Sequence, residues 1–369
     1  MGLVKKILII GGGTGGHLNP GIALYEEFKA KNLGVLFLAA KQDRKFPSLR
    51  EVNLSDLFFY GAPTFSRNIF KLLFFVPRFV FSILKTIKII KHHDVGAVIG
   101  MGGYVSAPAL IAAIFNKIPI FLCEQNSYPG KVTLWFEKYA ERVYATFAVS
   151  IKHLKFEHKF KHVGNPLRQK VFRTESKEEA RKFFNLEYNQ KVILVIGGSQ
   201  GALSLNQLFW AIKKKYPEEF KNIGVIWSIG SFSYDKFKSL LEKDVKQGSF
   251  YISPFIEQVG LAYKASDLAL SRSGAGVMME LAVNGIPAVY IPYPYAAKDH
   301  QRKNAEAFAE AGAALKIDES EAEVDKVASL IFNLLNNKRS LFRMSEKTRE
   351  LAKKESAALI VEDILEFIK

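Results

Sequence analysis

"GGGTGGHLNP", residues Gly11–Pro20, directly follows the apolar run Lys6–Ile10. A short apolar run, a glycine-rich turn and then a helical segment are typical of the first strand, loop and helix of a doubly wound α/β domain. Glycines let the backbone approach an anion closely, and the free N–H groups at the start of the next helix favour negative charge. The stretch therefore predicts a ligand-binding turn; the alternative is a tight strand-to-helix turn without a ligand.

The turn lacks residues that two common classes of nucleotide-binding loop require. Gly11-x-Gly13-x-x-Gly16 matches the dinucleotide pattern, but that pattern requires an acidic residue where the second strand ends. Here the strand ends in Ala39-Ala40-Lys41, and Asp43 comes too late. A Walker A loop is excluded because His17 stands where lysine is required and no Ser or Thr follows it. His17 is either a structural histidine or, at the carboxyl end of a strand, a general base that works near neutral pH.

Composition sets the broad class of protein. A chain of 369 residues predicts two domains, and 49% hydrophobic with 24% charged residues is typical of a folded chain. The net charge of +16 indicates an anionic partner, such as a phosphorylated substrate or acidic lipid. No nucleic-acid motif is present, so no nucleic-acid partner is expected. The single Cys123 fits a reducing compartment, and without a visible signal peptide we expect a cytoplasmic location.

Apolar runs alternate with helix-period segments through most of the chain, which is typical of β-α-β units and a parallel sheet. Each half opens alike, with "KKILIIGGGTGG" and later "QKVILVIGGSQGA". We therefore predict an α/β protein of two doubly wound, Rossmann-like domains. The predicted strands are Ile7–Ile10, Val35–Ala39, Ala97–Ile99, Ile118–Leu122, Val192–Ile196, Val225–Ile229, Leu268–Leu270 and Ala288–Ile291.

The domain boundary is expected in "HVGNPLRQ", where Gly, Asn and Pro interrupt the pattern. The expected domains are residues 1–163 and 164–349, with a C-terminal helix at about 350–369 that packs back on the first domain.

Seven motifs in order carry a resemblance to a known family. They are "GGTGGHLNPGIA", "GMGGYVSAPA", "CEQNSYPG", "VGNPLR", "GGSQGA", "SRSGAGVMMELA" and "HQRKNA". The chain resembles the MurG family of glycosyltransferases, in glycosyltransferase family 28. The resemblance implies the GT-B fold, with two parallel sheets facing an interdomain cleft. It also implies inverting transfer of N-acetylglucosamine from UDP-GlcNAc to the C4 hydroxyl of MurNAc in undecaprenyl-diphosphate-linked MurNAc-pentapeptide (lipid I), which forms lipid II for peptidoglycan synthesis.

The same resemblance assigns roles to residues. It implies His17 as the catalytic base, with Glu124 as a reserve. Glu280 would bind the ribose, because a carboxylate accepts from both vicinal hydroxyls. The other donor-binding residues implied are Thr14, Gly15, Gly16, Asn126, Arg168, Ser199, Ile256, Ala275, Gly276, Val277, Met278, Met279 and Gln301. The acceptor-binding residues implied are Gly102, Gly103, Tyr104 and Ser106.

Two departures from the family pattern stand out. Relatives often carry Thr or Ser where this chain has Val277-Met278-Met279, so backbone amides must serve there; Cys123 replaces a common His. No cofactor or metal is expected, because the chain lacks an Asp-x-Asp motif for Mg²⁺. His158 and His162 have helix spacing for a metal pair but no third ligand nearby.

Residues 69–93, "IFKLLFFVPRFVFSILKTIKIIKHH", indicate membrane contact. Lys71, Pro77, Arg78 and Lys85 interrupt the segment too often for it to span a bilayer. The three basic residues lie along one helical stripe beside bulky apolar side chains, a pattern typical of an interfacial helix on anionic lipid. We expect peripheral binding at the cytoplasmic face of the cell membrane; a buried amphipathic helix pair is the alternative.

Three other functions remain open at this stage. A diacylglycerol sugar transferase of the same fold would lack a diphosphate on its acceptor. An NAD-dependent oxidoreductase would bind nicotinamide. A catalytically silent membrane-binding protein would not need His17.

Overall fold

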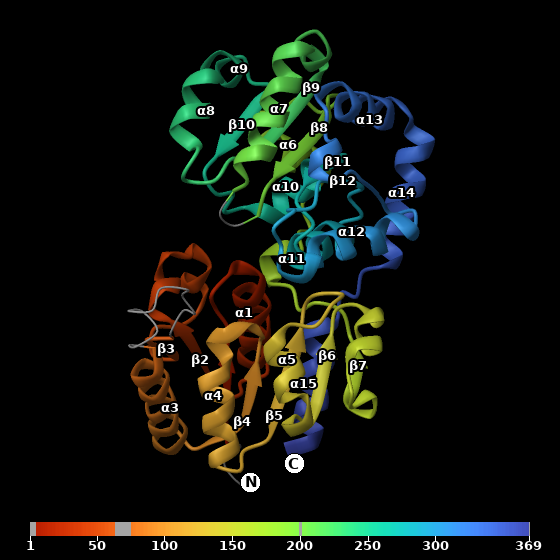
Figure 1. Ribbon diagram of the computed structural model, residues 1–369. Helices are drawn as coiled ribbons and strands as arrows, with labels where there is room; N and C mark the ends of the chain where they lie inside the picture. The colour runs from red at the N-terminus through yellow and green to blue at the C-terminus, as the bar shows by residue number, and fades with distance from the viewer. Residues whose placement is uncertain (1–4, 63–74, 199–200, 369) are drawn as a thin grey trace. The chain divides into compact units, whose positions relative to one another are not determined.

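The computed structural model describes residues 5–62, 75–198 and 201–368. The chain divides into two compact units: unit 1 comprises Met1–Arg168 and Lys353–Lys369, and unit 2 comprises Gln169–Ala352. Each unit is a parallel sheet with helices on both faces (Figure 1).

The boundary lies after Arg168 rather than after residue 163, because the connecting segment belongs to unit 1. The Gly164 N–H donates to the carbonyl oxygen of Ala145 at 3.2 Å, which extends the ladder of the sheet. Arg168 donates to the carboxylate of Glu51 at 3.1 Å and is buried. Gly and Pro in this segment therefore shape a chain that still packs on unit 1.

Unit 1 contains a seven-stranded parallel sheet with the order β3-β2-β1-β4-β5-β6-β7. The central strands read as continuous apolar runs because helices cover both of their faces. The strands are β1 (Lys6–Ile10), β2 (Val35–Ala40), β3 (Leu57–Tyr60), β4 (Val95–Gly100), β5 (Ile120–Glu124), β6 (Arg142–Ala145) and β7 (Phe160–His162).

The helices of unit 1 form two hydrophobic clusters, one on each face of the sheet. The C-terminal helix joins the cluster on the α1 face, where Ile360, Val361 and Ile364 are fully buried. The helices are α1 (Gly15–Ala30), α3 (Phe75–His92), α4 (Gly103–Phe115), α5 (Lys131–Phe136) and α15 (Ser356–Ile368).

Unit 2 contains a six-stranded parallel sheet with the order β10-β9-β8-β11-β12-β13. Its strands are β8 (Lys191–Ile196), β9 (Ile223–Ser228), β10 (Phe250–Ser253), β11 (Leu268–Ser271), β12 (Ala288–Tyr290) and β13 (Ala314–Lys316). Its helices are α6 (Lys177–Phe183), α7 (Leu203–Lys215), α8 (Tyr234–Leu240), α9 (Glu242–Lys246), α10 (Val259–Ala265), α11 (Ala275–Val283), α12 (His300–Glu310), α13 (Val324–Asn336) and α14 (Lys338–Glu350).

The predicted fold class of two doubly wound units with parallel sheets is confirmed. Five strands were not predicted, namely β3, β6, β7, β10 and β13. All five lie at or next to a sheet edge and are short, so they lack the long apolar run of a central strand.

The strand order reverses direction between β1 and β4 in unit 1 and between β8 and β11 in unit 2. In open α/β sheets, ligands bind at the carboxyl ends of the strands at this switch point. The glycine-rich turn at Gly11 follows β1, and the turn at Gly102 follows β4. The fold therefore places both glycine turns of unit 1 at the position where a site is expected.

Candidate active site

His17 lies in the first turn of α1, immediately after the glycine turn, and is half-buried. Its Nδ1 atom lies 2.8 Å from Oε1 of Gln125, which follows β5. This contact between His17 and Gln125 connects the carboxyl ends of β1 and β5.

The turn after β4 supplies the other wall around His17. A Cβ atom on Gly102 would lie 3.3 Å from ring atoms Cε1 and Nδ1, and one on Gly103 would lie 3.0 Å from Cδ2. Both glycines have positive φ angles, 83° and 67°, which other residues rarely adopt. Glycine is therefore required here both by the backbone and by the ring that packs against it.

Asp43 is a site residue that the sequence analysis set aside. Its carboxylate oxygens accept from the Gly13 N–H at 3.0 and 3.1 Å, and Oδ2 also accepts from the Ala40 N–H at 3.0 Å. Burial raises the pKa of Asp43, although these two backbone hydrogen bonds act to lower it. The Gly13 amide is therefore already bound by a carboxylate of the chain in this structure.

The position of Asp43 had a signal in the sequence. It follows β2, which pairs with β1, and the acidic residue of a dinucleotide site also lies after the second strand. A Cβ on Gly12 would lie 2.1 Å from its Oδ2 atom, so Gly12 makes room for the carboxylate.

Two predicted acceptor-binding side chains differ in exposure. Tyr104 is 43% exposed, and its hydroxyl accepts from Nε2 of Gln42 at 3.2 Å. Ser106 is fully buried, and its hydroxyl donates to the carbonyl oxygen of Gly102 at 2.7 Å. The structure therefore gives Ser106 the task of holding the turn, and leaves Tyr104 facing outward.

Glu124 is buried and orders the loop that follows β5. Its Oε1 accepts from the Asn126 N–H at 3.0 Å, and its Oε2 accepts from the Gly130 N–H at 2.8 Å and from Oγ1 of Thr133 at 2.6 Å. Because both oxygens are engaged within the loop, the arrangement argues against Glu124 as a reserve base. It positions Asn126, which is half-buried.

The remaining unit 1 residues predicted for the donor occupy different surroundings. Thr14 and Gly16 are exposed at the start of α1, and Gly15 is buried. Arg168 is buried and paired with Glu51, so a ligand would have to share its guanidinium with that carboxylate.

In unit 2, the turn after β11 leads into α11, where the predicted residues Ala275–Glu280 lie. Among the described residues, the start of α11 has no side-chain cap and no acidic residue in its first turn. A Cβ on Gly274 or Gly276 would meet no described atom within 4 Å. The first N–H groups of a helix have no partner within the helix, so this end suits an anion.

Glu280 lies in the same helix and is mostly buried. It accepts a hydrogen bond from the hydroxyl of Tyr263 in α10. The backbone carbonyl of Glu280 accepts from Nδ2 of Asn284 at 2.8 Å, which fixes the end of the helix.

Arg272 is a second residue that the sequence analysis missed. It is buried, and its NH1 donates to the carbonyl oxygens of Ile291 and Pro292 at 2.9 and 3.0 Å. Its NH2 donates to Oγ of Ser204 at 2.6 Å and pairs with Glu319. Arg272 thus joins the ends of β11 and β12 to the start of α7 next to the α11 turn, and its positive charge is paired with Glu319.

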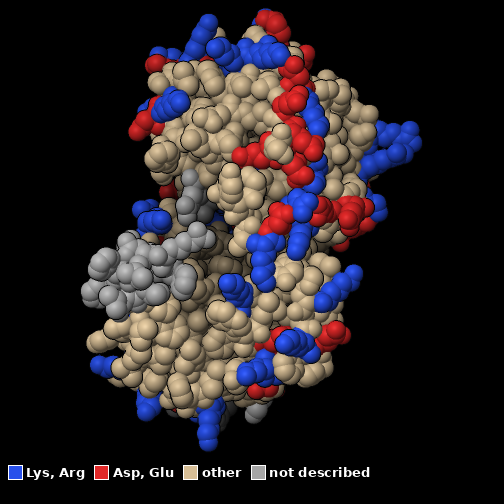
Figure 2. Space-filling model, viewed as in Figure 1, with Lys and Arg blue, Asp and Glu red and all other residues tan. Residues whose placement is uncertain are grey.

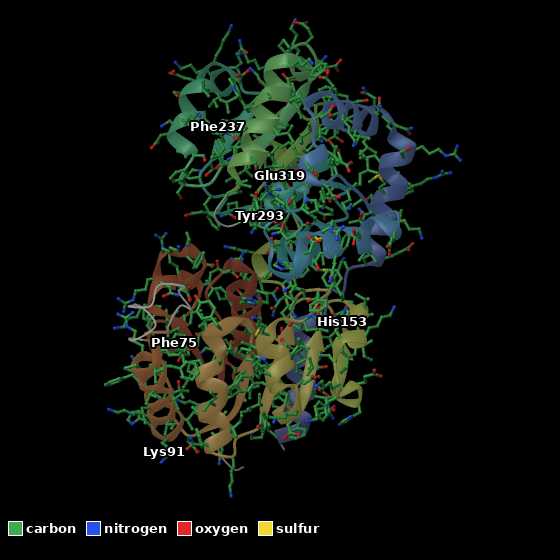
Figure 3. The ribbon with its side chains drawn as sticks, in the orientation of Figure 1. Phe75, Lys91, His153, Phe237, Tyr293 and Glu319 are labelled. Carbon is green, nitrogen blue, oxygen red and sulfur yellow. The ribbon has the colours of Figure 1, made fainter. Side chains whose placement is uncertain are left out.

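Gln301, at the start of α12, accepts from the Tyr293 N–H at 3.0 Å through its side chain. A cavity of about 540 Å³ adjoins this region, close to Tyr293 and Glu319 as labelled in Figure 3. It is lined by Pro292, Pro294, Tyr295, Asp299, Arg302, Asp318, Glu319 and Ser320.

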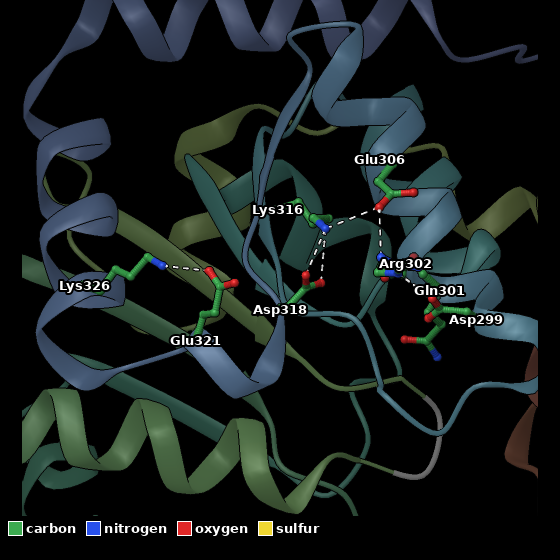
Figure 4. Close-up of polar contacts among 9 residues, drawn as sticks. Asp299, Gln301, Arg302, Glu306, Lys316, Asp318, Glu321 and Lys326 are labelled. Carbon is green, nitrogen blue, oxygen red and sulfur yellow. Dashed lines mark hydrogen bonds and ion pairs between the residues drawn. The ribbon is translucent and has the colours of Figure 1, made fainter.

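The charged groups of the cavity are paired with one another (Figure 4). Arg302 pairs with Asp299, and Lys316 Nζ lies 3.2 Å from Asp318 and 3.4 Å from Glu306. Paired charges with aromatic and proline surfaces suit a polar, uncharged group better than a free ion.

Of the other predicted residues, Ile256 is buried after β10, and Ser199 lies outside the described residues. Within residues 5–62, 75–198 and 201–368, no group of three His, Cys, Asp or Glu side chains is placed to hold a metal ion. In the same part of the chain, none of the helices has the length and apolar character needed to cross a bilayer.

Two doubly wound units, each with a glycine-rich turn at its switch point, define the GT-B class of sugar-nucleotide enzymes. The sequence profile of the N-terminal domain of glycosyltransferase family 28 matches residues 7–145, and that of the C-terminal domain matches residues 192–364. The chain belongs to glycosyltransferase family 28.

Relatives match over nearly the whole chain. One from Aquifex aeolicus is 34% identical over 97% of this chain and 99% of its own, and one from Halothermothrix orenii is 33% identical over 94% and 95%. Both are named UDP-N-acetylglucosamine–N-acetylmuramyl-(pentapeptide) pyrophosphoryl-undecaprenol N-acetylglucosamine transferase. The crystal structure of Acinetobacter baumannii MurG has a TM-score of 0.71 at 25% identity and covers 98% of this chain and 100% of its own.

Proposed function

We propose that this protein transfers N-acetylglucosamine from UDP-GlcNAc to the C4 hydroxyl of MurNAc in lipid I, with inversion, and so forms lipid II. The single observation that carries the proposal is His17, held half-buried at the unit 1 switch point between the turns after β1 and β4. Family membership and the relatives' names support the choice of substrates.

The reaction is a single displacement at the anomeric carbon. The acceptor hydroxyl loses its proton to the imidazole of His17 while its oxygen bonds to the anomeric carbon. The bond from that carbon to the diphosphate breaks, and its electron pair leaves with UDP. The turn at Gly102 lies beside His17, and the exposed Tyr104 follows in the same turn; both would receive the acceptor diphosphate.

The developing charge on UDP requires stabilisation without a metal in this proposal. The uncapped start of α11 offers backbone N–H groups for this charge, and Arg272, paired with Glu319, holds the turn that precedes them. Glu280 would bind the ribose hydroxyls, and Gln301 would bind the sugar beside the 540 Å³ cavity. Residues 277–279 carry no hydroxyl side chain, so backbone amides would make these contacts.

A thermal-shift panel tests the donor. UDP and UDP-GlcNAc should stabilise the protein by about 2.7 kcal/mol at a concentration one hundred times Kd, while GDP, ADP and NAD should not. Equal shifts for all five compounds would rule out a uridine site.

A transfer assay tests the acceptor. UDP-GlcNAc is supplied with either lipid I or diacylglycerol, and we expect product only with lipid I. Product from diacylglycerol alone would replace lipid I with a lipid that has no diphosphate.

We further propose that α3 binds the cytoplasmic face of the cell membrane. Its buried residues include Ser82 and Thr86, whereas Phe81 is 73% and Leu84 is 56% exposed. The hydroxyl of Thr86 donates to the carbonyl oxygen of Ser82 at 2.8 Å, so the inward polar groups are satisfied within the helix. Ile89 and Ile90 are also buried, so α3 packs on the sheet through its C-terminal half, while Phe81 and Leu84 remain exposed on the outer face, where bulky apolar side chains suit an apolar environment.

Basic side chains accompany this apolar surface. Arg78, Lys85, Lys88 and Lys91 are exposed along α3; Lys71, the third member of the predicted stripe, lies outside the described residues. Figure 2 shows a broad face of unit 1 without charged side chains, with Lys and Arg at its margin. Apolar side chains bordered by positive charge favour an anionic lipid surface.

Vesicle co-sedimentation tests the membrane proposal. Phe81→Asp with Leu84→Asp should weaken binding to phosphatidylglycerol vesicles by at least about tenfold, because two apolar side chains no longer enter the lipid. Leu54→Asp is the matched control, since Leu54 is 89% exposed outside α3 and should bind as the wild type does. Unchanged binding of the double variant would rule out α3 as the contact.

A further inference from the structure

We propose that Gln125 is a positioning residue that holds His17 in the tautomer with a proton on Nδ1, so that Nε2 is the atom that accepts the proton of the acceptor hydroxyl. This inference rests on the proposed function for the identity of the hydroxyl. The geometry behind it concerns only side chains of unit 1.

The orientation of the Gln125 amide is determined by the backbone. Gln125 is buried, and its Nε2 donates to the carbonyl oxygen of Cys123 at 3.1 Å. A carbonyl oxygen can only accept, so the amide nitrogen must face Cys123. The amide oxygen is therefore directed toward His17.

The orientation of the amide in turn determines the tautomer of His17. The Gln125 Oε1 atom lies 2.8 Å from Nδ1, and an amide oxygen can only accept. Nδ1 must then carry the hydrogen. In a neutral imidazole the second nitrogen has the lone pair, so Nε2 is the basic atom.

The ring is also held against rotation. Gly102 and Gly103 pack against opposite edges of the imidazole, with hypothetical Cβ positions 3.3 Å from Nδ1 and 3.3 Å from Nε2 respectively. The hydrogen bond at Nδ1 and the backbone of Gly102 and Gly103 along the ring together favour one ring orientation. In that orientation Nε2 lies beside the turn at Gly102.

An amide and a carboxylate would affect His17 differently at this position. Both accept from Nδ1, but a carboxylate also stabilises the imidazolium, which cannot accept another proton. A neutral partner leaves the imidazole ready as a base and still bonds to Nδ1 after Nε2 takes the proton. Glutamine therefore orients the imidazole of His17 without placing a negative charge beside it.

The test combines nitrogen NMR of the imidazole in ¹⁵N-histidine-labelled protein with the pH profile of kcat. In the wild type above the acid limb, Nε2 should give the signal of an unprotonated ring nitrogen and Nδ1 that of a protonated one. Gln125→Met should yield a mixture of tautomers and lower kcat about tenfold, with the KM for UDP-GlcNAc within about twofold of wild type.

Gln125→Glu is the matched partner of that variant, because it keeps an acceptor and adds a charge. It should retain the Nδ1 proton and move the acid limb of the kcat profile about one unit to higher pH. If Gln125→Met fails to fold, as the dispersion of its NMR spectrum would reveal, the wild-type spectrum and Gln125→Glu still decide the matter.

The two proposals fail in different ways. A wild-type protein that makes lipid II while Nε2 carries the proton would overturn the role of Gln125 and leave the function intact. The predicted tautomer in a protein that transfers no sugar would support the role of Gln125 in setting the tautomer and overturn the function.

Discussion

The β1–α1 turn of unit 1 and the β11–α11 turn of unit 2 both lead from a central strand through glycine into a helix at a switch point, yet a carboxylate of the chain binds the first turn and no described side chain caps the helix after the second. In unit 1, buried Asp43 accepts from the Gly13 N–H. In unit 2, the buried Arg272 beside the turn is paired with Glu319, and the described residues place no acidic group in the first turn of α11.

This difference indicates two uses for one backbone pattern. In unit 1 the carboxylate occupies a turn amide, so the turn serves to position the side chain of His17. In unit 2 the helix start remains available to an anion. Glycine spacing alone does not distinguish a turn that holds a catalytic side chain from one that holds a phosphate. The difference is whether a side chain of the protein already binds the backbone amides.

The largest expected effect is that of His17→Ala. If the unit 1 turn serves catalysis, kcat for transfer to lipid I should fall by about 10²–10⁴-fold, because the base is lost. The Kd of UDP, measured by calorimetry, should change less than about twofold, because unit 2 is untouched. A parallel loss of UDP affinity would contradict the division of roles between the turns.

The second prediction introduces an acidic side chain, the type that Asp43 supplies in unit 1, at the start of α11 in unit 2. Gly276→Asp should raise the Kd of UDP about tenfold, because a carboxylate at the helix start repels the diphosphate. A Cβ at this position meets no described atom within 4 Å, and an acidic residue near a helix start does not weaken the helix. Gly276→Ala is the control and should bind UDP within about twofold of wild type.

The converse change removes the charge from unit 1. Asp43→Asn should lower the free energy of unfolding of unit 1 by about 1–3 kcal/mol, because one of the buried backbone N–H groups of Gly13 and Ala40 loses its acceptor. Chemical denaturation measures this loss. Unaltered stability would show that the carboxylate does not hold the turn, and the UDP thermal shift should stay as in the wild type.

The smallest effect concerns pH and is confined to unit 1. Lys353 Nζ donates to the carbonyl oxygen of His162 at 2.8 Å, and burial together with the Lys353 charge lowers the pKa of His162. The unfolded chain therefore binds this proton more readily, so stability is present above the ordinary histidine pKa and is lost as pH falls below it.

Hydrogen exchange of α15 measures this pH effect, since Lys353 precedes that helix. Exchange should become faster on going from pH 7 to pH 5, after correction for the intrinsic rate, and His162→Gln should reduce the change. An equal change in the variant would assign the pH dependence to other groups.

Much of the fold was predictable because central strands are buried on both faces and read as apolar runs, as in Ile7–Ile10 and Val192–Ile196. Strands such as β7, with the sequence Phe-Lys-His, have one neighbour and exposed side chains, so their periodicity does not distinguish them from loops. The predicted domain boundary, after residue 163, differs from the observed one, after Arg168, for a related reason. The buried contacts of Arg168 cannot be seen in the pattern of Gly and Pro.

The sequence by itself determined the class, the glycine turns, His17 and the basic, apolar character of residues 69–93, because these depend on local composition and spacing. Only the tertiary structure decided that Asp43 meets Gly13, that Gln125 meets His17 and that Ser82 and Thr86 face inward on α3. These contacts join residues up to 108 positions apart, and strand order, rather than local sequence, brings such residues together.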